Sequence, residues 1–188
     1  MQGAGLARRK RLNKTLFLVF SIFVMIVLVF IDQLTKSLFT KIYQKNGVTT
    51  VIKDFFYFTY VENTGAAWSF LSDASWAQLF FKSLTIVSLI IFGLFFVYAY
   101  KKNYKWLQFS LAITIAGTIG NFIDRIRFSA VTDFVKFIFG DYHFPVFNVA
   151  DICLTIGVIM IIFHLLFLDE AAVFSRKKVE VQSKDETV

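Results

Sequence analysis

Long apolar runs separated by short polar segments dominate the chain. Four runs approach the ~20 mainly apolar residues that a membrane-crossing helix needs. They cover residues 15–31, 77–100, 106–121 and 146–168, and a polar tail follows from about 171 to 188. The pattern predicts an all-α membrane protein with four transmembrane helices in a single membrane-embedded domain spanning 1–188.

The third run is the least hydrophobic of the four and contains small residues at regular spacing. Ala112, Ala116 and Gly120 recur every four positions. Small residues at this spacing let another helix approach closely. We therefore expect the third helix to lie inside the bundle.

Two connections carry their own patterns. Residues 48–61 are rich in β-branched and aromatic residues, and Lys53-Asp54 is a candidate turn. This predicts a small β-hairpin on the outer membrane surface. The apolar segment 63–71, which contains Gly and Ala, is expected to dip into the interface.

The first run is expected to be retained as a span. It follows a basic segment, as a signal peptide does, but it is longer than the usual ~7–15 residue apolar core and has no small-x-small cleavage site after it.

Positive charge predicts the orientation. The net charge is +7, and Lys and Arg gather in the N-terminal tail, at 101–105 and in the C-terminal tail. All three segments fall on one side of a four-span chain, which the positive-inside rule makes cytoplasmic. Both termini are then inside, and 32–76 and 122–145 face outward. Because the charge flanks apolar runs, we expect membrane lipid and no nucleic acid as partner.

Ionisable residues cluster at the outer ends of the predicted spans. Asp32 and Lys36 are spaced i, i+4 and would form an ion pair on a helix. Asp124 and Arg125 admit the same structural interpretation. Since Arg125 lies on the outer side, against the positive-inside trend, it is also a candidate to orient a carboxylate or a substrate carbonyl.

Asp151 lies at the start of an otherwise apolar helix. Asn148 is a candidate N-cap, and an acid in the first turn is stabilised by the helix dipole. This structural interpretation explains Asn148 well. It explains Asp151 less well, because ionisable groups at membrane depth are costly and usually functional.

Asp133 lies between apolar residues in a segment without Gly or Pro, so a turn is not expected there. The short connection can bring Asp133 to the start of the fourth helix. Two carboxylates in a low-dielectric site share a proton and titrate together. Such a pair can activate water with one member and protonate a leaving amine with the other.

Other chemistries are poorly supplied. His143 and His164 lie far apart in the chain, and Cys153 is the only cysteine. Neither a histidine-based triad nor a zinc site is indicated, and we expect no metal and no cofactor. Cys153 is expected to be a small buried apolar residue.

Two alternatives remain on this reasoning. A small transporter would use Asp133 and Asp151 to bind a cation or proton, although such acids more often lie near the bilayer midplane. A structural assembly factor would use buried ion pairs for packing.

Five motifs resemble those of the lipoprotein signal peptidase family, also called signal peptidase II. They appear in the family's order as DQLTK (32–36), NTGAAWS (63–69), GNFIDR (120–125), VTDF (131–134) and FNVAD (147–151). The resemblance extends from Asp32 to about Gly157. Trp68 and Thr132 depart from the more usual residues.

The resemblance implies a bacterial aspartic endopeptidase of the cytoplasmic membrane, with its active site near the outer face. Its substrates would be diacylglyceryl-modified prolipoproteins, cut just before the lipidated cysteine. By motif match, the catalytic pair is Asp133 and Asp151. The residues that match positions around the catalytic pair and the substrate are Asn63, Gly65, Asn121, Arg125, Asn148 and Ala150. Asp32 and Lys36 match supporting positions, and Asp124 is expected to have a structural role beside them.

Overall fold

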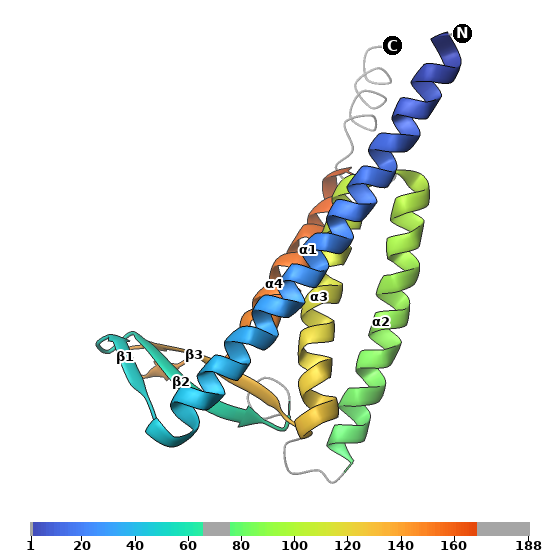
Figure 1. Cartoon of the computed structure of the whole chain (residues 1–188). Coiled ribbons are helices and arrows are strands. Elements are labelled where there is room, and N and C mark those ends of the chain that lie inside the picture. The colour runs from blue at the N-terminus through green and yellow to red at the C-terminus, as the bar shows by residue number, and fades with distance from the viewer. Residues whose placement is uncertain (1, 66–75, 169–188) are drawn as a thin grey trace, which may run out of the picture.

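The computed structural model describes residues 2–65 and 76–168. In it, four helices are long and apolar enough to cross a membrane, which confirms the predicted fold class of four membrane-spanning helices. The helices form a bundle, and a small sheet projects sideways from one end of it (Figure 1). The predicted interfacial segment 63–71, from residue 66 onward, and the polar tail lie outside the described residues.

Helix α1 (Gln2–Asn46) is much longer than its predicted span, with 45 residues. No glycine or proline interrupts residues 6–46, so nothing local stops the helix until Gly47, which has φ 77°. The helix therefore carries Asp32 and Lys36 on its own extension beyond the apolar run.

Helix α2 (Ala77–Lys102) agrees closely with its prediction, and α3 (Lys105–Phe128) runs seven residues past the predicted end at 121. The polar outer turns of α3 stay helical until Ser129, whose φ of 55° ends the helix. Asn121 and Asp124 are thus held on a rigid helix rather than in a loop.

Helix α4 (Val149–Phe163) starts three residues later than expected, after the N-cap Asn148. A short π-helical segment (His164–Leu168) completes the span. Cys153 is buried, as expected.

The sheet contains four antiparallel strands in the order β1-β2-β3-β4. Strands β1 (Thr49–Ile52) and β2 (Phe56–Asn63) form the predicted hairpin, with Asp54 in the turn at φ 57°. Strand β3 (Val131–Phe139) and the short β4 (Tyr142–His143) extend it, which the sequence reasoning did not predict. Because β3 pairs with β2, Asp133 lies opposite Val61.

Helix α3 is the centre of the bundle, as the small residues predicted. Within its apolar window 61% of residues are buried, against 6–17% for the other three spans. Glycines allow the close approach: a Cβ at Gly117 or Gly157 would collide with the facing helix. Of the predicted small residues, Gly120 lies closest to the site, since a Cβ there would be 2.5 Å from Asp32 Oδ2.

Candidate functional site

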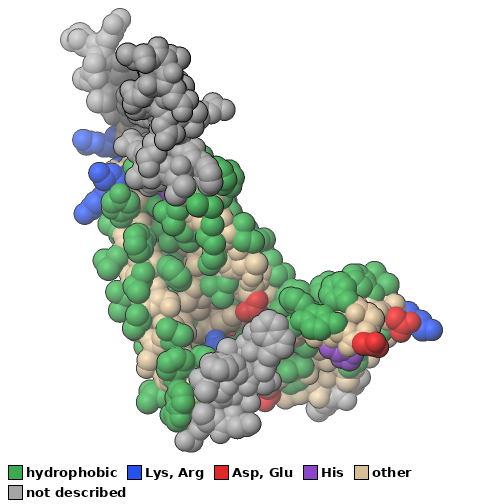
Figure 2. Space-filling view, turned by 180° about the vertical axis from the view of Figure 1, so that it is seen from behind, with side chains coloured by type: hydrophobic (Ala, Val, Ile, Leu, Met, Phe, Trp, Pro, Cys, Tyr) green, Lys and Arg blue, Asp and Glu red, His purple; other side chains and the backbone are tan. Residues whose placement is uncertain are grey.

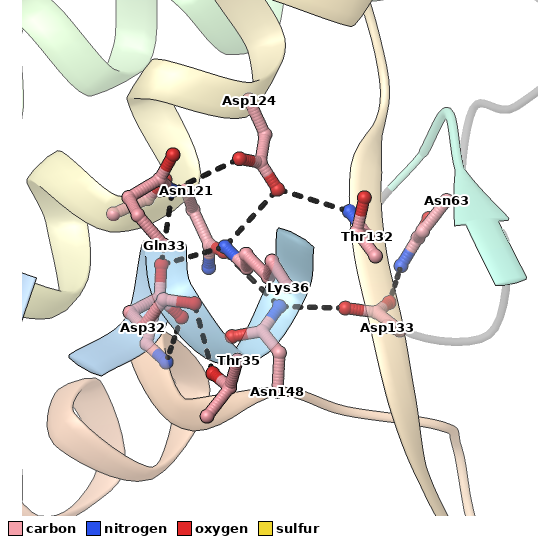
Figure 3. A network of polar contacts seen from close by, with 12 residues as sticks. Asp32, Gln33, Thr35, Lys36, Asn63, Asn121, Asp124, Thr132, Asp133 and Asn148 are labelled. Carbon is pink, nitrogen blue, oxygen red and sulfur yellow. Dashed lines mark hydrogen bonds and ion pairs between the residues drawn. The ribbon is translucent and has the colours of Figure 1, made fainter. Parts of the chain in front are cut away.

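Polar side chains from α1, α3, β3 and α4 converge where the sheet meets the bundle (Figure 3). Helices supply most of them from their outer turns, and β3 supplies Asp133. Segments far apart in sequence therefore build one connected network.

Lys36 is the centre of the buried half of this network. Its ammonium lies 2.9 Å from Asp32 Oδ2 and 3.1 Å from Asp124 Oδ2. All three side chains are almost fully buried. Buried charges require such pairing, because an unpaired ion away from water is very costly. The expected Asp32–Lys36 pair is present, whereas Asp124 pairs with Lys36 and not with Arg125 within the described residues.

The two carboxylates of this cluster also accept backbone hydrogen bonds. Asp32 Oδ1 accepts from the N–H of Ala150 at 2.8 Å, and Asp124 Oδ2 accepts from the N–H of Thr132 at 3.1 Å. The cluster therefore ties α1 to the first turn of α4, and α3 to β3.

Gln33 belongs to the same cluster, although the sequence reasoning gave it no role. Its Nε2 lies 3.0 Å from Asp124 Oδ1 and 3.1 Å from the carbonyl oxygen of Gly120. Two signals pointed to it: a polar amide at the membrane end of an apolar helix, and its place inside the DQLTK motif.

Asn148 caps α4 and joins the two candidate catalytic acids. Its Oδ1 accepts from the N–H of Asp151, and its own N–H donates to Asp151 Oδ2, both at 3.0 Å. This is the reciprocal capping box expected at a helix start. Its Nδ2 donates to Asp133 Oδ1 at 2.6 Å.

Asp133 is buried on β3 between two amide donors. Besides the bond from Asn148, its Oδ2 accepts from Asn63 Nδ2 at 2.9 Å. Burial, with the nearby charge of Asp151, raises the pKa of Asp133 from 3.8 to about 7, although the hydrogen bonds from Asn63 and Asn148 lower it. A carboxyl group with this pKa holds a proton over much of the acidic and neutral range.

Asp133 and Asp151 line one cavity of about 970 Å³. Asn63, Asn121 and Arg125 also line it, and much of the remaining wall is apolar and comes from α2, α4 and the β4–α4 connection. Figure 2 shows charged side chains in the hollow between the bundle and the sheet, with hydrophobic side chains on the bundle and on the sheet to either side. The acids thus face a space large enough for a substrate segment.

Arg125 faces the same cavity from α3. Its Nη2 donates to the carbonyl oxygen of Gly65 at 3.3 Å, and its guanidinium lies 5.3 Å from the centre of the Phe81 ring. Its Nε is buried and makes no hydrogen bond to a described residue. Arg127, by contrast, is exposed and lies over the ring of Phe128.

Two of the predicted site residues, Ala150 and Gly65, do not line the cavity and instead support its surroundings through packing and backbone hydrogen bonds. Ala150 is fully buried against α3, and its side chain would lie 3.1 Å from a Cβ at Gly120. Gly65, next to the undescribed segment, accepts from Arg125 and donates its N–H to Asn63 Oδ1 at 3.1 Å. Within the described ranges, no group of His, Cys, Asp and Glu has the arrangement to hold a metal ion.

The fold and site define a four-span membrane protein with two carboxyl groups at one largely apolar cavity. Comparison with known families identifies it further, because the model of signal peptidase (SPase) II matches residues 11–167. The chain belongs to the signal peptidase II family, whose members are proteases.

Similar proteins agree with this assignment. A lipoprotein signal peptidase of Clostridium tetani is 39% identical over 77% of this chain and 91% of the relative. One of Bacillus pumilus is 40% identical over 74% of this chain and 88% of the relative. A solved structure, described as a bacterial membrane enzyme studied by the in meso method, aligns with a TM-score of 0.67 at 37% identity, over 78% of this chain and 87% of that one.

Proposed function

We propose that this chain is an aspartic endopeptidase that removes signal peptides from diacylglyceryl-modified prolipoproteins, cutting before the lipidated cysteine. Asp133 and Asp151 are its catalytic pair. One observation carries the proposal: both acids line one cavity, and both are hydrogen-bonded to Asn148. The family membership and the names of the relatives support the substrate class.

The two acids have different surroundings and hence different roles. Asp133 carries the proton, since the pKa of its carboxyl group is raised to about 7. Asp151 accepts hydrogen bonds from the N–H of Asn148 and from Asn121 Nδ2, which hold its carboxyl oxygens in place as acceptors, as a base requires. This assignment gives one acid and one base at neutral pH.

With these roles, the two acids can hydrolyse a peptide bond without forming a covalent intermediate with the substrate. Ionised Asp151 removes a proton from water, and the resulting hydroxide adds to the scissile carbonyl carbon. Protonated Asp133 gives its proton to the nitrogen as the C–N bond breaks. Asp151 is left protonated and Asp133 ionised, and proton exchange with solvent restores the pair.

Arg125 is proposed to orient the substrate carbonyl. Its buried Nε has no partner among described residues, and it lies on the cavity wall. A guanidinium supplies fixed donors for such a contact. Its hydrogen bond to Gly65 positions the group near the end of β2.

The apolar walls suit a lipid-anchored substrate. Leu84 and Phe92 of α2 face the cavity from one side, and Ile152 and Ile156 of α4 from the other. A segment embedded in the bilayer can reach such a cavity sideways, between these two helices. Figure 2 shows hydrophobic side chains over the helices and over the adjoining side of the projecting sheet, which suits contact with lipid.

The proposed orientation follows the charge distribution. Both termini and the α2–α3 turn lie on the cytoplasmic side, and the sheet and acid pair lie near the outer face of the bacterial cytoplasmic membrane. Residues 1–188 are proposed to act as one membrane-embedded peptidase domain.

Cleavage of a lipidated prolipoprotein by the purified chain tests the proposal. We expect Asp133→Asn and Asp151→Asn to abolish cleavage while substrate still co-purifies. Asp141→Asn is the matched control, because Asp141 is exposed and does not line the cavity. Wild-type rates in either dyad variant would refute the catalytic assignment. Proton-coupled transport without any cleavage would favour the transporter alternative.

A further inference from the structure

A second pocket lies at the opposite end of the bundle from the sheet. It has a volume of about 720 Å³ and is formed by the polar turn of α1 just before its apolar run, together with the α2–α3 turn. Its lining includes three cationic side chains, Arg11, Lys14 and Lys105, and no acidic one. Figure 2 shows Lys and Arg side chains gathered at this end of the bundle.

Local contacts hold two of these cations in place. Lys14 Nζ donates to the carbonyl oxygen of Lys101 at 3.1 Å and lies 4.5 Å from the centre of the Tyr100 ring. Lys105 Nζ lies 5.4 Å from the centre of the Phe17 ring. The ammonium groups are therefore positioned by aromatic faces and a backbone carbonyl.

No carboxylate neutralises this charge within the described residues. The two ion pairs found there both involve Lys36, at the other end of the bundle. Asn13 and Asn103 add amide groups to the pocket lining. Converging cations and amides without an acid form a setting for an anion with several acceptor oxygens, such as phosphate.

The position of the pocket indicates where that phosphate comes from. Three membrane spans have an end here, at Arg11, Lys102 and Lys105. The ends of membrane spans lie at the level of lipid headgroups. On the adjoining turns, Leu16 and Val97 are exposed and apolar, and can contact acyl chains.

We propose that this pocket binds the phosphate of an anionic phospholipid headgroup, as carried by phosphatidylglycerol. Arg11, Lys14 and Lys105 contact the phosphate oxygens, and the asparagine amides contact the remaining polar headgroup. The site shares no residue with the acid pair, so it stands independently of the proposed catalysis. Basic pockets between spans are known to hold anionic headgroups in other membrane proteins.

Lipid-dependent thermal stability of the purified full-length chain tests the proposal. The chain is reconstituted in phosphatidylcholine nanodiscs with increasing phosphatidylglycerol, and its unfolding temperature is followed. The test variant is Lys14→Gln/Lys105→Gln. The matched control is Lys101→Gln/Lys102→Gln, which removes the same charge from exposed side chains outside the pocket lining. Inorganic phosphate is added in a separate arm.

We expect phosphatidylglycerol to raise the unfolding temperature of the wild type and of the control. The test variant should need about tenfold more of the lipid for the same rise. The Lys14→Arg/Lys105→Arg variant should restore the response, which separates lipid binding from misfolding.

Three outcomes would overturn the proposal. An equal loss of the lipid-dependent rise in unfolding temperature in the test variant and the control would show only a general attraction of basic residues to the membrane. A wild type that does not respond to the lipid would show no site. Equal stabilisation by inorganic phosphate in lipid-free detergent would assign the pocket to free phosphate.

Discussion

Lys36 and Asp151 are joined through one side chain, the amide of Asn121. Lys36 Nζ donates to Asn121 Oδ1 at 2.9 Å, and Asn121 Nδ2 donates to Asp151 Oδ1 at 2.8 Å. Because an ammonium can only donate, Lys36 requires the oxygen of the amide to face it. The NH₂ group must then face Asp151, so a residue on α1 fixes a donor for a residue on α4.

Loss of the Lys36 charge should weaken the whole site. In Lys36→Met, Asp32 and Asp124 lose their buried partner, and we expect a destabilisation of about 3–5 kcal/mol. Lys41→Met, an exposed position on the same helix, should change stability little. Thermal unfolding of both variants in detergent checks this, and equal unfolding temperatures would contradict it.

Cleavage should depend on pH through Asp133. In the proposed mechanism its carboxyl group must be protonated to serve as the acid, and its pKa is raised to about 7. The rate kcat/KM should therefore fall as pH rises through about 7. An unchanged rate from pH 6 to pH 9, measured with a substrate that does not titrate in this range, would remove Asp133 from the acid role.

The same shift has a consequence for stability with a defined sign. The pKa of Asp133 is near 3.8 when unfolded and about 7 when folded, so between these values the folded chain binds more protons. Stability contributed by this group is present below about pH 4 and is lost as pH rises through about 7. Asp133→Asn should remove that part of the pH dependence. Parallel stability curves for the variant and the wild type would contradict the shift.

Arg125 and Arg127 should differ sharply despite being two residues apart. Arg125→Ala removes a cation from the cavity wall and should lower cleavage at least about tenfold. Arg127→Ala removes an exposed side chain and should leave the rate within about twofold. The processing assay compares the two directly, and equal tolerance would exclude Arg125 from the site.

Gly120 should not tolerate even a methyl group. A Cβ there would lie 2.5 Å from Asp32 Oδ2, so Gly120→Ala must displace the Asp32 carboxylate, at a cost of about 1–3 kcal/mol. Gly93→Ala meets nothing within 4 Å and should be neutral or slightly stabilising, by up to about 1 kcal/mol. Unfolding temperatures of the pair test this, and equal values would refute it.

Local sequence patterns predicted much of the fold. The apolar runs located four spans, the small residues placed α3 centrally, and Lys53-Asp54 located the hairpin turn. The spacing of Asp32 and Lys36 predicted their ion pair, and Asn148 was predicted as the cap of α4. Each of these features depends on residues close together in sequence, where periodicity and capping rules apply.

The remaining features depend on distant partners. Asp32 accepts from Ala150 across 118 residues, and Gln33 reaches Asp124 across 91. The addition of β3 to the hairpin was likewise missed, because strand pairing across 68–81 residues leaves no local signal. Through resemblance, the five motifs identified most residues of the polar network. They did not predict which of these residues form hydrogen bonds with one another.

Helix α2 contributes cavity wall, but none of its side chains bonds to the polar cluster around Lys36, Asn148 and the two acids within the described residues. The side chains of this cluster come from α1, β2, α3, β3 and the start of α4, while α2 packs chiefly on α3. Substitutions along the cavity side of α2 can therefore change the shape of the cavity, and with it substrate selectivity, while the two acids keep their positions. Under the proposed mechanism, an inhibitor anchored on the acid pair would be harder to evade than one that relies on α2, since substitutions at the pair would also remove activity.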